Sequence, residues 1–549
     1  MNTFLLLSST LWAEEDASRI LKPELERNLQ QLQLPDQPKP YFIGVHLQQQ
    51  EYWYSRASLG ALMFHQHNAK QKMTVDMRVG SAEFDNRNFS GGFASSWQSS
   101  MMPIYATPAL YQRNLWLLCD EAYKNAVEEY SEKIAAFPNP ENQEILDFLP
   151  SPPVRVSKSR KIKAKDLSPM AIRLSQYMPM GWEDLSVSVL DRNRDHHFLS
   201  TEKSDIQQTD RYSVLHMKGV RKASDGADVV AHRWWVVPSP KYLPKEPALR
   251  KEMAHMVDWL KELQTADVEE DYLGPVLFEP KAAAEFFRQL LPTQIVGTPP
   301  SREAPSEYEA SIVFSSAREG RRLFKENWKV EDLPLKTGLL GSYQYDYEGV
   351  PAQNMTLVEK GVLKDVLMSR TPREGKEAST GHARGRLNSR MTAMPSNVRI
   401  TPPKRHPLED MRKKALQLSR QVGNDYVLIV RVLTPLELHD SLEIAFSGDA
   451  PLSGISAPLE MVRLYRNGRE EPVRGGKFFG VDRRIFKDIV MAGPQSDWHN
   501  VIDRPPSDMR FNIGFFGYGS SWSAPSILIS EMELRGASGG EKHVTPAPF

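Results

Sequence analysis

The chain has 549 residues, of which 40% are hydrophobic and 25% are charged. This composition is that of an ordinary globular protein long enough for more than one domain. The 69 basic and 69 acidic residues cancel, so no overall field favours nucleic acid or an anionic membrane. A single cysteine, Cys119, excludes a disulfide framework. No run of about 18 apolar residues predicts a membrane span.

The first residues bear on localisation. An apolar stretch over 4–13 precedes the acidic run Glu14–Asp16, which is similar to the end of a signal peptide that lacks a basic start. We therefore expect residues 1–16 to be a signal remnant and the protein to be periplasmic or secreted. A cytoplasmic protein is the alternative.

The rest of the chain divides into two parts. We expect an N-terminal α+β domain over 17–270, made of antiparallel strands and helices, with an exposed linker near 137–166. The basic run Lys158–Lys165 lies in that linker and is interpreted as solvated chain. A largely β C-terminal domain over 271–537 follows, and residues 538–549 are expected to be a flexible tail.

Hydrophobic periodicity predicts the elements of the first part. Asp120 is the expected N-cap of a long helix, Asp225-Gly226 predicts a hairpin turn, and His196-His197 is placed in a turn. Stretches with helical spacing of apolar residues are 17–34, 120–136 and 249–263. Stretches with period-two patterning, the predicted strands, are 41–47, 52–68, 73–79, 185–190, 197–200, 212–221 and 228–237.

The second part predicts short strands separated by Gly and Pro, with one helix over 409–421. Lys360-Gly361 and Asn467-Gly468 are typical of hairpin turns. The predicted strands are 341–347, 354–359, 362–369, 426–433 and 459–466.

The sequence contains no convincing catalytic site. Hydrolytic zinc needs imidazole, carboxylate or thiolate ligands on a rigid element, yet none of the 13 histidines is followed by Glu. His65 and His67 would point to the same side of a strand, as two ligands without a visible third. No Gly-x-Ser-x-Gly elbow or phosphate-binding loop occurs either.

Several blocks resemble the TldD/PmbA peptidase family in order and spacing. The most specific is 345–353 (Tyr-Asp-Tyr-Glu-Gly-Val-Pro-Ala-Gln), which is similar to the family's Asp-x-Glu-Gly-Val-Pro block. Four further stretches also resemble family elements: 74–80, 120–126, 379–384 and 524–530. The chain is identified as a member of this family, and the resemblance implies its type of largely β C-terminal domain.

One departure from the family pattern is informative. Catalytic TldD-type subunits carry a His-Glu-x-x-x-His helix at the start of the second half and a cysteine ligand further on. The corresponding stretch here, 274–287, has a predicted strand and helix without histidine, and no cysteine follows Cys119. In this respect the chain resembles the TldE/PmbA-type subunit, with no metal ligands and no catalytic residues of its own. Zinc is expected in a TldD-like partner.

The resemblance implies a heterodimer with a TldD-like zinc metallopeptidase, or a homodimer, that encloses an unfolded peptide. Main-chain hydrogen bonds would hold such a peptide with little side-chain selection. Asp346, Glu348 and Gly349, or the hairpin at Gly361, are the candidate substrate-binding residues, although a tight bend set by Gly349 and Pro351 is the favoured interpretation. The alternatives are an envelope peptide-binding or scaffold protein without proteolysis, and a hydrolase with an atypical metal site near His65 and His67.

Overall fold

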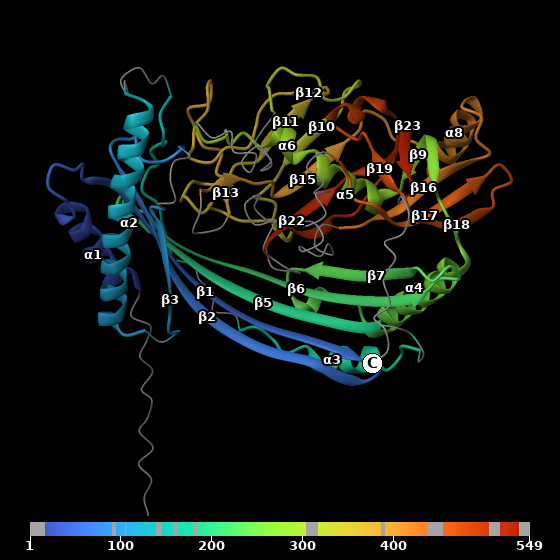
Figure 1. Ribbon diagram of the computed structural model, residues 1–549, viewed down its shortest axis with the longest axis horizontal. Coiled ribbons are helices and arrows are strands. Elements are labelled where there is room, and N and C mark those ends of the chain that lie inside the picture. The colour runs from blue at the N-terminus through green and yellow to red at the C-terminus, as the bar shows by residue number, and fades with distance from the viewer. Residues whose placement is uncertain are drawn as a thin grey trace, which may run out of the picture.

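A computed structural model describes residues 17–89, 95–104, 106–138, 145–157, 163–179, 182, 184–302, 317–385, 390–435, 454–503 and 517–536. The predicted signal remnant and C-terminal tail lie outside these residues. A long curved sheet runs beneath a second body of shorter strands (Figure 1). The predicted α+β class is therefore confirmed.

The N-terminal sheet has seven strands in the order β3-β2-β1-β5-β6-β4, with β7 also paired to β6. Alternate residues of β1 and β2, such as Val45 and Val75, are fully buried beneath helices on the outer face. The other face of the sheet looks toward the second body and is mixed. It carries polar side chains such as Arg194 and an apolar cluster in which Tyr212 and Trp234 pack with Val432 and Ile502 of the second body. The strands are β1 (Pro40–Ser58), β2 (Ala61–Val79), β3 (Trp97–Met102), β4 (Arg155–Ser157), β5 (Asp184–Ser200), β6 (Asp205–Lys222) and β7 (Asp228–Val237).

The prediction of three short strands over 41–79 is wrong. The segment is one hairpin whose two long strands turn at Leu59-Gly60, and both turn residues have positive φ. Gly supplies that conformation readily, but a single Leu-Gly pair inside alternating sequence is a weak turn signal. The predicted strands 185–190 and 197–200 are parts of one continuous strand, β5, because the polar residues between them also pair with β1 and β6. His196 and His197 therefore lie in a strand and not in a turn.

Helices cover the outer face of the sheet at both ends (Figure 1). The predicted second helix is longer than expected because it begins at Pro108, where Thr107 caps it by accepting a hydrogen bond from Leu110 N. Asp120 lies inside that helix and is not its cap, while Cys119 is buried against the sheet. The helices of this domain are α1 (Ala17–Gln31), α2 (Pro108–Ala136), α3 (Ser168–Ser175), the 3₁₀ turn η2 (Pro240–Tyr242) and α4 (Glu246–Thr265).

The described part of 137–166 is not an exposed linker throughout. Asp147, Phe148 and Leu149 are buried, because the Phe148 ring lies between the guanidinium groups of Arg78 and Arg370, at 3.6 and 3.8 Å. Such cation–π contacts are favourable when water is excluded. This stretch therefore ties the two domains together.

The C-terminal body contains an eight-stranded and a six-stranded sheet and one two-stranded ladder around the largest apolar core. Its helices are α5 (Pro280–Leu290), α6 (Pro292–Ile295), α8 (Leu408–Gln421) and the 3₁₀ turn η4 (Arg483–Asp488). The eight-stranded sheet holds β8 (Asp267–Val268), β9 (Asp271–Phe278), β16 (Tyr426–Leu433), β17 (Pro458–Tyr465), β18 (Glu470–Arg474), β19 (Lys477–Phe479), β20 (Ile489–Gln495) and β23 (Pro525–Arg535). The other strands are β10 (Lys329–Asp332), β11 (Met355–Glu359), β12 (Val362–Leu363), β13 (Ala383–Arg384), β14 (Thr392–Ala393), β15 (Asn397–Thr401), β21 (His499–Asp503) and β22 (Tyr518–Ser523).

Strand β16 and helix α8 confirm their sequence-based predictions, whereas 341–347 forms turns and a single bridge instead of a strand. Only Val362–Leu363 of the predicted strand 362–369 pairs as one. In the part of the chain that the structure describes, no helix is both long and apolar enough to cross a membrane.

Candidate functional site

The family-like block 345–353 forms a loop that docks on the inner face of the N-terminal sheet. Gln208 Nε2 on β6 donates a hydrogen bond to the carbonyl of Tyr345 at 3.0 Å. The Tyr345 ring packs with Phe198 and Ile206 in a small apolar cluster. The loop therefore lies at the seam between the two domains.

Asp346 is buried and holds this loop in shape. Its Oδ1 accepts hydrogen bonds from the backbone N–H of Glu348 and Val350, at 3.0 and 2.9 Å, and its Oδ2 accepts one from Ala383 N at 3.0 Å. Burial and the nearby Glu348 charge raise the pKa of Asp346 to about 8. These three backbone N–H groups bond both carboxylate oxygens of Asp346, so the side chain stabilises the conformation of the loop.

Glu348 joins the loop to the segment around Arg370. Its Oε2 accepts a hydrogen bond from Arg370 N at 2.6 Å, and burial raises the pKa of its carboxyl group. The Arg370 side chain bonds the carbonyl of Leu149 and the carboxylate of Glu202, each at 2.6 Å. Glu348 thus belongs to a buried interdomain network.

Gly349 and Gly361 both require positive φ but lie in different surroundings. Gly349 has φ +84°, and a Cβ there would stand 2.9 Å from the Phe198 ring. Gly361 has φ +75°, and a Cβ there would stand 2.3 Å from the carbonyl oxygen of Glu326. The structure brings Asp346, Glu348 and Gly349 together, while Gly361 packs on the 324–328 turn. Their role in substrate binding stays a prediction.

Tyr347 forms the centre of an aromatic and cationic stack that sequence reasoning missed. Its ring centroid lies 4.5 Å from that of His196, and its hydroxyl accepts a hydrogen bond from Arg194 Nη2 at 2.7 Å. His196 in turn contacts His46 through ring nitrogens 3.0 Å apart, and burial lowers the pKa of both imidazoles. Every residue from Arg192 to His197 is polar, so no alternation marked which of these side chains share a face of the strand, and no local signal in the sequence indicated this stack.

Helix α5 carries a second buried polar cluster. Glu285 accepts hydrogen bonds from Arg288 Nη1 at 3.1 Å to each oxygen and from Gln289 Nε2 at 2.8 Å. Arg288 also donates to Asp503 Oδ1 at 2.8 Å and to the carbonyl of Ile502 at 2.9 Å. Glu285 and Arg288 are almost completely buried. A desolvated ion pair of this kind persists only with such complete hydrogen bonding.

Two further basic groups adjoin this cluster. Lys281, in the first turn of α5, places its ammonium 3.5 Å from the Trp234 ring of β7, and burial lowers its pKa to about 8. Burial together with the positive charges of Lys281 and Arg288 lowers the pKa of His499 to about 3. The neighbourhood of Glu285 is therefore cationic.

The donor set on α5 does not fit a hydrolytic zinc ion. Aligned on Glu285, a His-Glu-x-x-x-His pattern would place histidines at 284 and 289, where the chain has Ala284 and Gln289. Zinc needs neutral imidazole, thiolate or carboxylate donors, and the Glu285 carboxylate is already held by the Arg288 cation. No cluster of at least three His, Cys, Asp or Glu residues able to hold a metal occurs within the described ranges.

His65 and His67 share one side of β2, as the strand period requires, and both stack near Trp53. His65 Nδ1 lies 2.9 Å from Ser55 Oγ, and His67 Nε2 lies 3.0 Å from Glu51 Oε1. Each imidazole thus has its own neighbour, and the two are not directed at a common third ligand.

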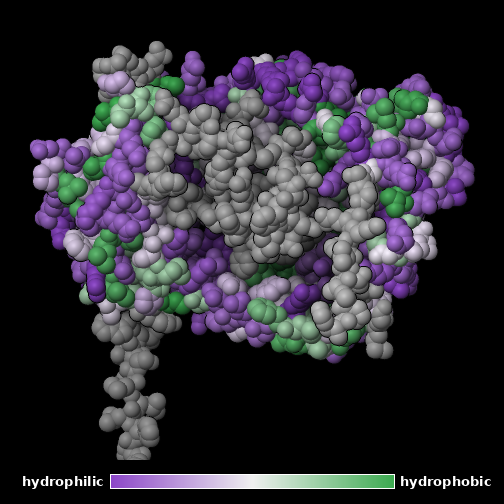
Figure 2. All heavy atoms as spheres, in the orientation of Figure 1, coloured by the Kyte–Doolittle hydropathy of each residue, from purple (hydrophilic) through white to green (hydrophobic). Residues whose placement is uncertain are grey.

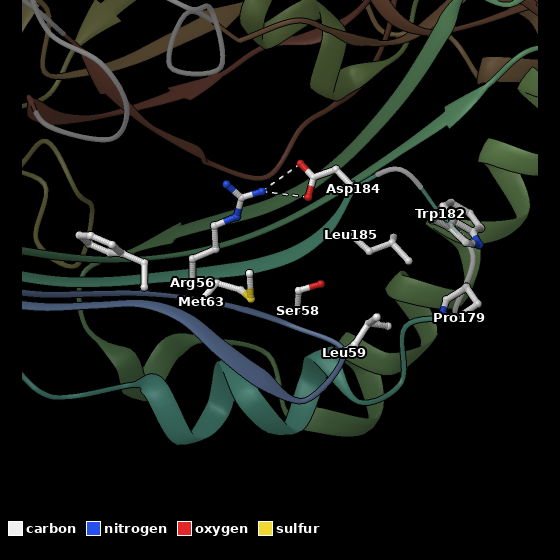
Figure 3. Close-up of a pocket in the computed structure, with 9 residues that line it drawn as sticks. Arg56, Ser58, Leu59, Met63, Pro179, Trp182, Asp184 and Leu185 are labelled. Carbon is white, nitrogen blue, oxygen red and sulfur yellow. Dashed lines mark hydrogen bonds and ion pairs between the residues drawn. The ribbon is translucent and has the colours of Figure 1, made fainter. Parts of the chain in front are cut away.

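A cavity of about 480 Å³ opens at the tip of the β1–β2 hairpin (Figure 3). Its wall is mixed, with the apolar Leu59, Met63 and Trp182 beside the polar Ser58. Arg56 and Asp184 also line the cavity and form an ion pair, with 2.9 Å between Arg56 Nη2 and Asp184 Oδ1. This cavity lies at the far end of the sheet from the 345–349 loop.

Comparison with known proteins bears on both halves of the chain. Residues 271–536 match the model of the PmbA/TldA metallopeptidase C-terminal domain. An uncharacterised protein of Methanocaldococcus jannaschii is 31% identical over 173 residues, which are 31% of this chain and 36% of that protein. The match thus spans about a third of that relative's length.

Solved structures share the fold over most of the chain. TldE from Thermococcus kodakarensis aligns with a TM-score of 0.57 and 12% identity, covering 94% of this chain and all 100% of that one. A candidate modulator of DNA gyrase from Thermotoga maritima aligns with a TM-score of 0.56 and 14% identity, covering 90% and 96%. A third, from Bacteroides thetaiotaomicron, aligns with a TM-score of 0.56 and 11% identity, covering 94% and 98%. The TM-scores over most of each chain establish a common fold, and at these low identities they establish only the fold.

Proposed function

We propose that this chain, which belongs to the TldD/PmbA family, is a zinc-less subunit that completes a proteolytic heterodimer with a TldD-like metallopeptidase. The observation that carries the proposal is the α5 cluster. Where catalytic relatives are expected to hold zinc, this chain has Ala284 and Gln289 around a Glu285 that is paired with Arg288. A guanidinium in that place opposes a divalent cation by simple charge repulsion.

The partner supplies the zinc and its activated water, and this chain supplies part of the surface that holds an unfolded peptide. The 345–349 loop is held at the interdomain seam by the Asp346 and Glu348 contacts. Residues 346–349 are buried, so the loop would position the two domains around that surface without offering its own main-chain groups. Export of the protein to the periplasm is part of the same proposal.

Metal analysis combined with a peptidase assay tests the proposal. The purified full-length chain is expected to hold no stoichiometric zinc and to cleave an unstructured casein substrate only after a TldD-like subunit is added. A double variant, His65→Ala with His67→Ala, separates this proposal from an atypical metal site and is expected to leave the activity of the mixture unchanged. Stoichiometric zinc bound by the isolated chain, or cleavage by it alone that the double variant abolishes, would overturn the proposal.

A further inference from the structure

Three arginine side chains, contributed by both domains, surround Tyr518 at the seam. Arg192 and Arg194 lie two positions apart on β5, so their side chains share the inner face of the sheet, and Arg384 comes from β13 of the second body. The guanidinium groups of Arg194 and Arg384 lie 4.5 and 5.5 Å from the centre of the Tyr518 ring. Arg192 donates a hydrogen bond to the neighbouring carbonyl of Gly517 at 3.0 Å. We call Arg192, Arg194 and Arg384 the arginine cluster.

Among the described residues, Asp210 on β6 is the one carboxylate that pairs directly with the arginine cluster. Arg194 Nε donates a hydrogen bond to Asp210 Oδ2 at 2.6 Å, and Arg192 Nη1 lies 3.8 Å from Asp210 Oδ1. Arg384 donates to the carbonyl of Gly519 at 3.1 Å. Although partial desolvation acts to raise the pKa of Asp210, the three arginines lower it overall. The ionised carboxylate therefore compensates one of the three positive charges.

Two hydrogen-bond donors of the arginine cluster have no acceptor. Arg192 Nε and Arg384 Nη1 are both buried, and neither bonds another group of the described chain. A buried donor on a charged group is costly to leave unpaired, and such a group in a folded protein calls for a partner that the chain itself does not supply. A bound anion would compensate the remaining positive charge and accept from these donors at the same time.

Solvent reaches the arginine cluster at Asp210. The Asp210 side chain is 40% exposed, whereas those of Arg192 and Arg194 are 3% and 5% exposed. Strands β5 and β6, which carry these residues, pass beneath β22 (Figure 1). The surface is hollowed between the N-terminal sheet and the second body, and hydrophilic residues gather in the hollow (Figure 2). A group that enters as far as Asp210 comes within reach of the cluster.

We propose that the arginine cluster binds a carboxylate of the unfolded peptide, either its C-terminal group or an acidic side chain. This inference rests on the proposed function, because it takes the peptide to lie between the two domains. A planar guanidinium group matches the two oxygens of a carboxylate with parallel hydrogen bonds. The Tyr518 ring beside Arg194 and the Tyr212 ring 4.9 Å from Arg192 hold these groups in place before the ligand arrives.

A carboxylate anchor supplies a preference that main-chain recognition lacks. Hydrogen bonds to an extended backbone accept almost any sequence, and side-chain contacts are what give specificity. A peptide whose carboxylate lies on the arginine cluster is held in one register. The chain is therefore expected to select peptides with a free C-terminus or with acidic residues from the wider pool of unfolded chains.

Titration calorimetry of the full-length chain with three synthetic peptides tests the inference. All three are acetylated hexapeptides of Ala, Gly and Ser: a free acid, its C-terminal amide, and the amide with one internal Glu. At least one of the two acidic peptides is expected to bind at least about tenfold more tightly than the neutral amide, and the tighter of the two identifies the source of the carboxylate. Equal affinity for all three, or no binding of any, would overturn the inference. Cleavage of casein by the mixture with a TldD-like subunit would still support the proposed function in that case.

Two substitutions are expected to change the preference for the acidic peptide in opposite directions. Arg384→Met removes a cation and should bring the affinities for the acidic peptide and the neutral amide close to equal. Asp210→Asn removes the carboxylate that competes for the same cations and should enlarge the difference, which a merely structural role of Asp210 does not predict. Arg211→Met is the matched control, because Arg211 pairs with Asp191 on the outer face of the same sheet, and it should leave the preference unchanged.

Circular dichroism and thermal melting show whether each variant folds. If Arg384→Met does not fold, Asp210→Asn decides the question. A preference that Arg384→Met leaves intact, or that Asp210→Asn reduces, would contradict carboxylate binding by the arginine cluster.

Discussion

Each domain contains a buried network of charged groups, and the two networks compensate the cost of burying charge in different ways. In the N-terminal domain, Lys133 donates to the carbonyls of Asp85 and Arg87, at 2.8 and 2.6 Å, and to Asp147 at 2.5 Å. In the C-terminal domain, Arg288 joins two carboxylates, Glu285 and Asp503. In the first network a compact ammonium group is surrounded mainly by backbone carbonyls. In the second a planar guanidinium group is shared between two carboxylates.

The difference shows what each network is for. Lys133 and Asp147 are completely buried, so their pairing clamps α2 to the segments around 85 and 147 and offers nothing to a ligand. Arg288 lies on the helix that in catalytic relatives is expected to carry zinc, and its partner Asp503 is partly exposed. The same chemistry is thus structural in one domain and, under the proposed function, replaces a metal site in the other.

The largest effect is expected from removing the enclosed cation. Lys133→Met leaves Asp147 buried without its cation and should lower the free energy of unfolding by about 3–5 kcal/mol, measured by denaturant titration. Lys124→Met, on the same helix but in an exposed pair with Asp120, should cost less than about 1 kcal/mol. Equal losses in the two variants would contradict the clamp.

A smaller loss is expected from Arg288→Met, at about 2–3 kcal/mol, because Asp503 keeps a hydrogen bond from Ser520. Arg412→Met removes a half-exposed arginine that also bridges two carboxylates, those of Glu279 and Glu470, and should cost under about 1 kcal/mol. The same denaturant titration measures both. A loss for Arg288→Met no larger than the control would show that the α5 cluster is not effectively buried.

The smallest effect is a dependence on pH. The folded-state pKa of His499, about 3, lies below the unfolded value of about 6.5, so the unfolded chain takes up the proton first as the pH falls. The stability that neutral His499 contributes is present above about pH 6.5 and is lost as the pH falls toward 3. His499→Gln should therefore reduce the loss of stability between about pH 6 and 4 by about 2 kcal/mol. An unchanged loss would show that His499 is protonated in the fold.

Local patterns correctly predicted the elements whose ends are marked by turn residues or proline, or whose buried side is marked by regular apolar spacing. Strand β7 ends where expected because Asp225-Gly226 marks its start and a proline follows Val237, and α8 follows its apolar spacing. The β1–β2 hairpin differs from the three strands predicted there, because Leu59-Gly60 is a weak turn signal. Helix α2 begins at Pro108 instead of near Asp120, because Thr107 caps it and Pro108 occupies its first turn.

The candidate site was predictable only in part. The 345–353 block was found by resemblance, and the lack of histidine on 274–287 is visible in the sequence itself. The stack of Tyr347 on His196 and the docking of Phe148 between two arginines were not found. Each joins residues far apart in the chain, and no local pattern records such a contact.

The sequence by itself carries the blocks that resemble the TldD/PmbA family, the periodicity that predicts an α+β class, the lack of a His-Glu-x-x-x-His run and the single cysteine, because these depend on residue identity and short-range periodicity. The tertiary structure alone decided which charges are enclosed, where the 345–349 loop docks and which half of β2 pairs with β3. Burial and strand pairing depend on what the rest of the chain places alongside each residue, and that information is not local.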